Sequence, residues 1–250
     1  KVVSLEELQR HLYSLPSQPS AIPYVTSYYR EEWGFCIEDE VRKTLQNGDY
    51  RVVIDSEFKE GSLTYGEVVL PGKSNDEIFF STYVCHPSLA NNEISGPALA
   101  AVLIRALLDD EKERKFTYRF LFAPETIGAI TYIARNPEVF DGRVKAAFNL
   151  TCVGDDRQYS FLPSKWGTSL SDAIGQHVLH HLVGEYKKYS FRSRGSDERQ
   201  FCWPGIDLPM VSLMRSKYGE YPEYHSDADN LNLVSENGLT LMTKYTRDQA

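Results

Sequence analysis

The stretch that decides the fold covers residues 78–96 and reads Ile78-Phe79-Phe80-Ser81-Thr82-Tyr83-Val84-Cys85-His86-Pro87-Ser88-Leu89-Ala90-Asn91-Asn92-Glu93-Ile94-Ser95-Gly96. Its apolar first half, Ile78–Val84, predicts a buried strand that ends beside His86, and Pro87 cannot continue that strand as a central ladder member. A polar loop follows, and an alanine- and leucine-rich helix is expected from Ala98 to about Leu108. Open α/β sheets build their sites where strands end, so His86 is a candidate site residue.

The segments after Pro71-Gly72 predict an α/β fold, a three-layer α/β/α sandwich with a mixed, mainly parallel central sheet. Strand-like and helix-like runs alternate there: strands at Thr117–Ala123, Ala146–Val153, Tyr189–Arg192 and Met210–Leu213, and helices near Gly128–Ala134, from Ser169 to about Tyr186, and from Ser235 onward. The segments before Pro71 alternate at period two, at Val25–Tyr28, Tyr50–Ser56 and Ser62–Leu70. That pattern predicts a small antiparallel β unit.

Three parts of the chain follow from this change of pattern. We expect residues 1–23, a short helix starting near Ser4 and a Pro- and Ser-rich connector, to belong to the α/β domain. Residues 24–71 are expected to form a β domain inserted into it, and residues 72–250 the α/β domain itself. The chain begins at Lys1 without Met or a signal-peptide pattern, so we expect a fragment of a longer protein.

Composition narrows the class of protein. The 250 residues are 42% hydrophobic and 25% charged, which is typical of a soluble globular domain. A net charge of −8 and a pI near 5.3 argue against a nucleic-acid partner, and no apolar run approaches the ~18 residues that span a membrane. Four cysteines lie far apart, three of them in or beside apolar runs, which favours reduced thiols in a cytoplasmic protein. The sequence leaves open whether the chain forms a homo-oligomer.

Two further segments supply candidate catalytic residues. Glu125 follows the apolar run Phe120–Ala123 and Pro124, where burial can raise the pKa of a carboxyl group into the range of a general base. His225 lies in a loop with Asp227 and Asp229, either of which could fix the imidazole tautomer for a metal ion. The alternatives are a helix-start acid for Glu125, a helix-capping loop histidine for His86 and an incidental histidine for His225.

Other polar segments carry weaker signals. Ser196–Phe201 is a charged insert that could be a solvated face or could orient a substrate. His177 and His181 stand four residues apart in the long predicted helix, but no acid occupies the HExxH position, so surface or packing histidines are expected. The sequence contains no GxSxG elbow, phosphate loop or GxGxxG motif.

Three motifs, Cys85–Gly96, Pro124–Gly128 and Gly195–Gln200, together resemble those of a known superfamily. They resemble the zinc aminopeptidases, which include bacterial leucyl aminopeptidases and glutaminyl cyclases. They resemble more closely a bacterial aminopeptidase-like family associated with polysaccharide biosynthesis clusters. The β unit at about Tyr24–Pro71 looks like that family's inserted domain, and Thr82–Asn230 looks like its catalytic core.

The resemblance implies a zinc site with fewer ligands than the superfamily has. His86 and His225 match the first and last histidine ligands. The aspartate that bridges two metal ions falls on Asn92, and two further carboxylate ligands fall on Thr126 and Thr151. Because the bridging anion is absent, a dinuclear site is not expected.

A single zinc ion remains compatible with the pattern. The resemblance implies His86 and His225 as ligands, with Glu93, Glu125 or the amide oxygen of Asn92 as the third. Glu125 also falls on the position of the superfamily's general base.

We therefore expect a zinc-dependent, mononuclear hydrolase of the aminopeptidase type that acts on a small peptide or an aminoacyl amide. Zinc would activate a water molecule and Glu125 would transfer its proton. The candidate substrate-binding residues are Asp197, Glu198, Asp227 and Tyr224. The alternative is a catalytically silent binding module that keeps the fold and has lost the metal cluster.

Overall fold

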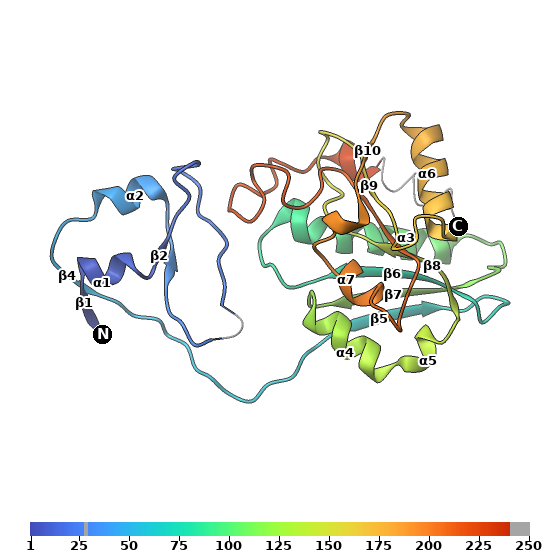
Figure 1. Cartoon of the computed structure of the whole chain (residues 1–250), viewed down its shortest axis with the longest axis horizontal. Coiled ribbons are helices and arrows are strands. Elements are labelled where there is room, and N and C mark those ends of the chain that lie inside the picture. The colour runs from blue at the N-terminus through green and yellow to red at the C-terminus, as the bar shows by residue number, and fades with distance from the viewer. Residues whose placement is uncertain (28–29, 241–250) are drawn as a thin grey trace. The chain divides into compact units, whose positions relative to one another are not determined.

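The computed structural model describes residues 1–27 and 30–240 as two compact units, coloured along the chain in Figure 1. Among the described residues, the first unit contains residues 1–27, 30–62 and 223–229, and the second contains residues 63–222 and 230–240. These boundaries differ from the predicted ones, because residues 1–23 share a unit with residues 24–62 and not with the large sheet.

A seven-stranded mixed sheet, in the order β10-β9-β11-β8-β6-β7-β5, forms the centre of the second unit. Its strands are β5 (Gly66–Leu70), β6 (Glu77–Tyr83), β7 (Thr117–Ala123), β8 (Val144–Asn149), β9 (Ser160–Leu162), β10 (Lys187–Lys188) and β11 (Met210–Met214). Neighbouring strands are parallel except at the β5–β7 and β9–β11 pairs. The predicted mixed, mainly parallel sheet is confirmed.

Helices cover both faces of this sheet (Figure 1). One face carries α3 (Ser95–Asp109) and α6 (Leu170–Leu182), and the other carries α4 (Ile127–Arg135), α5 (Pro137–Phe140) and α7 (Glu198–Phe201). Side chains alternate along β6 as strand geometry requires, so Phe80 packs in the first core and Phe79 in the second. The two cores confirm the predicted three-layer α/β/α sandwich.

The apolar character of the central strands follows from this double coverage. All seven residues of β6 are buried, because helices shield the strand on both faces. The predicted strand at Thr117–Ala123 has the observed bounds of β7, and the expected helix at Ala98–Leu108 lies inside α3.

The β5 strand corrects one prediction. The period-two run Ser62–Leu70 was expected in a separate β domain, but β5 pairs antiparallel with β7 at the edge of the central sheet, with Val68 opposite Phe120. Val68 packs against the first core while the neighbouring residues are exposed. Alternation therefore indicated an edge strand that is covered on one face, and not a change of domain.

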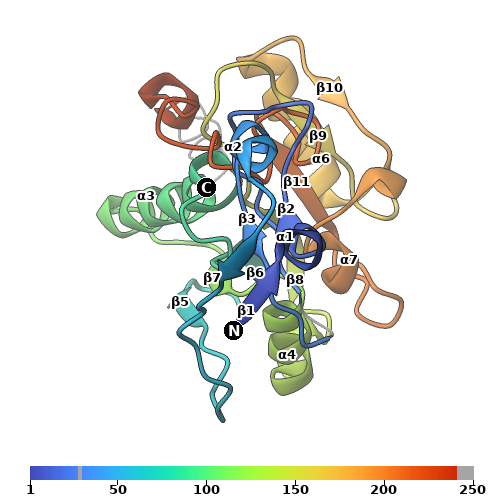
Figure 2. The same ribbon diagram turned by 90° about the vertical axis from the view of Figure 1, so that its left-hand side faces the viewer.

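The first unit is small and only partly antiparallel. Strand β1 (Val2–Ser4) pairs antiparallel with β4 (Asp49–Arg51), whereas β2 (Leu12–Tyr13) and β3 (Phe35–Cys36) are parallel. Helices α1 (Leu5–Gln9) and α2 (Asp39–Thr44) complete the unit, whose core contains Leu8, Leu12 and Val52; Figure 2 shows it facing the viewer. Neither β2 nor β3 is among the strands predicted for the β unit. Of the predicted strands, residues 24–27 form none, Tyr28 lies outside the described residues, and Tyr50–Ser56 is represented by the shorter β4.

A return segment, Glu223–Asp229, joins the first unit from far along the chain. Pro23 and Ser226 form an antiparallel bridge, and the backbone N–H of Tyr24 donates to the carbonyl of His225 at 2.7 Å. The N–H of Ile22 donates to the Asp227 carboxylate at 2.8 Å. The candidate residues Tyr224, His225 and Asp227 are therefore held by the first unit.

The remaining differences between the predicted and the observed elements lie at the periphery of the second unit. Strand β9 is not among the predicted elements, and the expected strand Tyr189–Arg192 is replaced by β10 and a 3-10 turn at Phe191–Ser193. Residues 236–240 are helical, and the rest of the helix predicted from Ser235 lies outside the described residues. None of the described helices is both long and apolar enough to cross a membrane.

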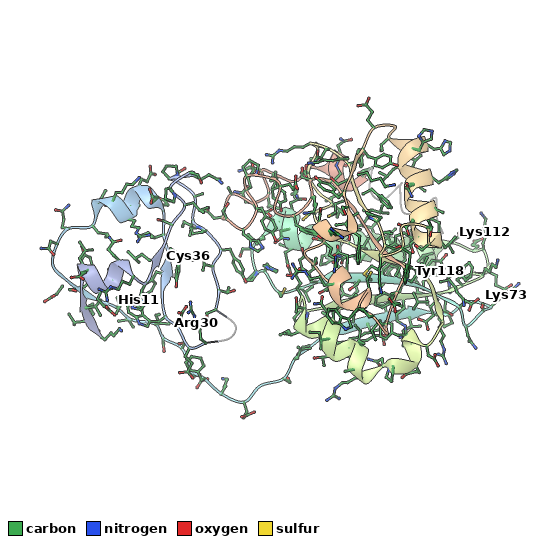
Figure 3. The ribbon with its side chains drawn as sticks, viewed as in Figure 1. His11, Arg30, Cys36, Lys73, Lys112 and Tyr118 are labelled. Atoms are coloured by element: carbon green, nitrogen blue, oxygen red, sulfur yellow. The ribbon has the colours of Figure 1, made fainter. Side chains whose placement is uncertain are left out.

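A groove of about 1240 Å³ opens at the amino ends of β6 and β7, where α3 ends and α6 begins. Tyr118, at the start of β7, lines it, and Figure 3 shows Lys73 and Lys112 near this end of the second unit. His86 follows the opposite, carboxyl end of β6. The groove is therefore separate from the candidate site.

Candidate metal and catalytic site

Two neighbouring parallel strands bring His86 and Glu125 together. Strands β6 and β7 pair in register up to Tyr83 and Ala123, and the N–H of Val84 still donates to the carbonyl of Ala123 at 3.1 Å. His86 and Glu125 follow these ends by a few residues, and His86 Nε2 lies 3.9 Å from Glu125 Oε2. His86 is 5% exposed and Glu125 is half-buried.

A widened helical turn adds Glu93 to the pair. Residues Ala90–Ile94 form a π-helical turn ahead of α3, a geometry that is rare and often found at functional sites. The turn directs the buried Glu93 carboxylate back to the end of β6, where Oε2 lies 3.0 Å from His86 Nδ1. Glu93 Oε1 accepts a hydrogen bond from the backbone N–H of Cys85.

Cys85 is a site residue that sequence reasoning missed. Its Sγ lies 3.2 Å from His86 Nδ1, and the backbone N–H of Glu125 donates to the same sulfur at 3.2 Å. Ligand atoms of Cys85, His86 and Glu93 all lie within 4.8 Å of one another, which is close enough for one metal ion to contact all three. The available signal was its position directly before His86 at a strand end.

Burial shifts the pKa values of the acidic groups around His86. Burial raises the pKa of the Glu125 carboxyl group, and a hydrogen bond with Ser196 opposes part of that rise. Burial also raises the pKa of Asp197 well above its ordinary value, with the charges of Glu125 and Glu198 adding to the effect. The pKa of the Cys85 thiol rises to about 12 because the side chain is buried among carboxylates.

Asp197 supports an unusual turn next to Glu125. Thr126 has φ +64° and ψ −70°, and the N–H of Ile127 donates to the carbonyl of Glu125 at 2.7 Å, which together define a γ-turn. A β-branched residue is strained in that conformation. The N–H of Thr126 donates to Asp197 Oδ1 at 2.8 Å, so Asp197 holds the turn that presents Glu125.

Glu198 is enclosed by hydrogen-bond donors. The N–H of Ser196 and the amide of Asn149 each donate to its carboxylate at 3.1 Å, and the hydroxyls of Ser212 and Tyr218 add two more hydrogen bonds. The residue is fully buried. These contacts connect α7 to β8 and β11, and they favour a structural role over the predicted contact with substrate.

Neutral hydrogen bonds occupy two of the positions where the superfamily has carboxylate ligands. Asn92 Nδ2 donates to the hydroxyl of Tyr83 at 2.7 Å, and the hydroxyl of Thr151 donates to the Asn92 carbonyl at 3.1 Å. Both residues are buried. Asn92 and Thr151 are therefore neighbours, as the resemblance implies, in a setting of amides and hydroxyls.

The return segment carries the other predicted site residues. Tyr224 and His225 stack with ring centroids 3.9 Å apart, and His225 has φ +56°, in the left-handed region. Asp227 pairs with the backbone of Ile22 in the same unit. The structure describes the two units as separate bodies, so the expected approach of His225 to His86 stays a prediction.

Comparison with known proteins agrees with this architecture. Residues 13–249 match a family model described as a domain of unknown function, DUF4910. A relative from Clostridium acetobutylicum, named as a polysaccharide biosynthesis protein with an aminopeptidase-like domain, is 45% identical over 239 residues, covering 96% of this chain and 54% of the relative. The chain thus spans about half the length of that relative.

Two solved structures share the fold. A crystal structure of a Clostridium acetobutylicum protein titled as a peptidase superposes with a TM-score of 0.94 at 43% identity, over 99% of this chain and 58% of that chain. A zinc aminopeptidase from Bacillus subtilis superposes with a TM-score of 0.59 at 15% identity, over 74% of this chain and 49% of that chain, which shows a common fold. This chain belongs to the DUF4910 family and has an aminopeptidase-like fold.

Proposed function

We propose that this chain is the catalytic part of a zinc-dependent hydrolase of the aminopeptidase type, which cleaves a peptide or amide bond with a single zinc ion. The observation that carries the proposal is the approach of the buried His86 and the half-buried Glu125 at the carboxyl ends of β6 and β7, with His86 Nε2 and Glu125 Oε2 3.9 Å apart. Sheets of this kind bind their ligands at that edge. The fold is shared with a structure titled as a zinc aminopeptidase.

The donors around His86 suit zinc. Imidazole nitrogen and carboxylate oxygen are among the groups that bind zinc in proteins, and His86 and Glu125 present one of each 3.9 Å apart. Zinc, when bound, polarises a substrate carbonyl and lowers the pKa of a bound water molecule. We assign His86 and His225 as ligands, with Glu125, Glu93 or the Asn92 amide oxygen as the third.

Glu125 is assigned as the group that moves the proton. Burial raises the pKa of its carboxyl group, which makes Glu125 a better proton acceptor, able to take a proton from water and deliver it to the leaving amine. Asp197 holds the backbone that presents Glu125. The candidates for binding the free amine of the substrate are Asp197 and, from the first unit, Asp227 with Tyr224.

The biological setting is proposed from the Clostridium relative, whose name places it in polysaccharide biosynthesis. An amide substrate from such a pathway would fit a hydrolase of this fold. A second candidate function, a silent binding module, draws its support from Asn92 and Thr151, whose neutral side chains stand where the superfamily has carboxylate ligands. The Thr151 hydroxyl donates a hydrogen bond to the backbone carbonyl of Asn92.

Metal analysis and one substitution test the proposal. Protein purified without chelator is expected to contain about one zinc ion and to hydrolyse members of an aminoacyl-amide panel. Glu125→Gln keeps the size of the side chain and removes the proton acceptor, so turnover should fall ~10²-fold or more at unchanged zinc content. Glu185→Gln, at an exposed position, is the matched control.

Two results would redirect the proposal. Zinc content that falls in parallel with activity would make Glu125 a ligand and not the base. Wild-type protein with neither zinc nor turnover would favour the silent binding module.

A further inference from the structure

We infer that Glu93 is a positioning residue and not a metal ligand: it holds the proton of His86 on Nδ1 and so assigns metal binding to Nε2. The metal in this inference rests on the proposed function, but the position of the proton does not. The inference excludes Glu93 as the third zinc ligand and leaves Glu125 and the Asn92 amide oxygen as candidates.

The Glu93 carboxylate already binds two groups of the strand end. Oε1 accepts the backbone N–H of Cys85, and Oε2 lies 3.0 Å from His86 Nδ1. An ionised carboxylate can only accept hydrogen bonds, so the imidazole nitrogen that faces it must carry the hydrogen. In a neutral imidazole the other nitrogen, Nε2, then has the lone pair that a metal ion needs.

The distances at Nδ1 are those of direct contact and not of ligands around an ion. With bonds of about 2.0–2.3 Å, two ligands of a tetrahedral zinc ion lie roughly 3.3–3.6 Å apart. The observed separations from Nδ1 are 3.0 Å to Glu93 Oε2 and 3.2 Å to Cys85 Sγ. The sulfur also accepts the N–H of Glu125. Cys85, His86 and Glu93 therefore contact one another directly on the Nδ1 side of the ring, at separations shorter than those of ligands around one zinc ion.

The opposite side of the ring has different geometry. His86 Nε2 and Glu125 Oε2 are 3.9 Å apart, which exceeds a direct hydrogen bond and suits two groups that share an ion or a water molecule. Glu125 is the proposed proton acceptor, so a metal on Nε2 brings the activated water and its base to the same side of the imidazole. A metal on Nδ1 would put them on opposite sides.

The position of Glu93 explains the π-helical turn. A carboxylate that hydrogen-bonds the second nitrogen of a ligand histidine fixes its tautomer and orientation, and its loss typically costs 10–100-fold in metal affinity. The turn Ala90–Ile94 brings Glu93 to that nitrogen from the start of α3. We therefore interpret the extra residue in the turn as the means by which Glu93 reaches His86.

Nitrogen NMR of metal-free protein tests the inference directly. In metal-free wild-type protein labelled with ¹⁵N in its histidine rings, the neutral imidazole of His86 should carry its proton on Nδ1. Its signals are assigned by their loss in His86→Gln. Glu93→Gln should shift the tautomer toward Nε2–H, whereas Cys85→Ser, which alters the other neighbour of Nδ1, should leave it unchanged. An Nε2–H tautomer in the wild type would overturn the inference, whatever the variants do.

Metal binding provides an independent readout. Zinc affinity, measured by competition with a chelating dye, should fall 10–100-fold in Glu93→Gln and stay unchanged in Cys85→Ser. Protein loaded with Co²⁺ should show no thiolate charge-transfer absorption. Such a band, lost in Cys85→Ser, would assign Cys85 as a ligand on the Nδ1 side and overturn the inference. Protein that binds no metal would defeat the proposed function, while the NMR result would still decide where the proton lies.

Discussion

Carboxylates at the two ends of strands β6 and β7 have different partners: an arginine at the amino ends and a histidine at the carboxyl ends. At the amino ends, Arg119 binds both oxygens of Glu77, at 2.6 and 2.9 Å, and reaches Glu67 at 2.6 Å. At the carboxyl ends, Glu93 and Glu125 approach one histidine, and no lysine or arginine pairs with either carboxylate in the part of the chain that the structure describes.

This difference separates a structural ion pair from a reactive site. A bidentate arginine fixes the charge of its carboxylates and satisfies their hydrogen-bonding groups, so nothing further needs to bind there. Carboxylates without such a partner are held by burial at raised pKa values, as Glu125 and Asp197 are. They are therefore suited to exchange a proton or to accept a metal ion.

The largest expected effect is a loss of stability when the ion pair at the amino ends of β6 and β7 is broken. Arg119→Met leaves the buried Glu77 carboxylate without its partner, and losing one member of a buried ion pair typically costs about 3–5 kcal/mol. Urea unfolding of wild type and variant measures the loss. Arg105→Met removes the exposed pair with Asp109 and should cost no more than about 1 kcal/mol. Equal losses in the two variants would contradict the structural role of Arg119.

An intermediate effect on stability is expected when zinc binds at the carboxyl ends of β6 and β7. Zinc that binds only the folded protein stabilises it by about 2.7 kcal/mol at a concentration 100-fold above its dissociation constant. Thermal unfolding with zinc and with chelator measures the increment. Arg119→Met should show the same increment, because distant independent sites add. Destabilisation by zinc would mean that the ion binds the unfolded chain more tightly.

The smallest effect on stability is expected at Asp197. Its carboxyl group can keep its proton, and it then avoids the repulsion from neighbouring carboxylates. Its pKa is raised in the folded state, so in metal-free protein its stabilising contribution is fully present below the ordinary pKa of 3.8 and is lost as pH rises through the folded pKa. Asp197→Asn cannot ionise. The variant should therefore gain stability relative to wild type as the pH rises above about 4, measured by urea unfolding. A difference that does not change with pH would contradict the raised pKa.

The sheet and part of the site were predictable because their signals are local. Buried parallel strands are apolar throughout, so Ile78–Val84 and Thr117–Ala123 identified β6 and β7, and the residues that follow them identified His86 and Glu125. Parallel pairing then brings those residues together without further information.

The remaining features depend on contacts that the local pattern does not encode. Alternation in β5 is the same for an edge strand and for a separate β domain, and only its pairing with β7 distinguishes them. The π-helical turn places Glu93 beside Nδ1 of His86, a contact that the hydrophobic pattern does not show. Cys85 joins the site because the backbone of Glu125 reaches its sulfur from another strand.

The return segment has a consequence for how the chain folds during synthesis. The bridge between Pro23 and Ser226 joins residues separated by most of the chain, so the first unit cannot be completed until residue 229 has left the ribosome. Closing so long a loop is entropically costly and slow. The second unit, whose strands β5–β11 lie between these two pieces, can therefore form first. Tyr224, His225 and Asp227 would then be among the last candidate site residues to reach their native positions.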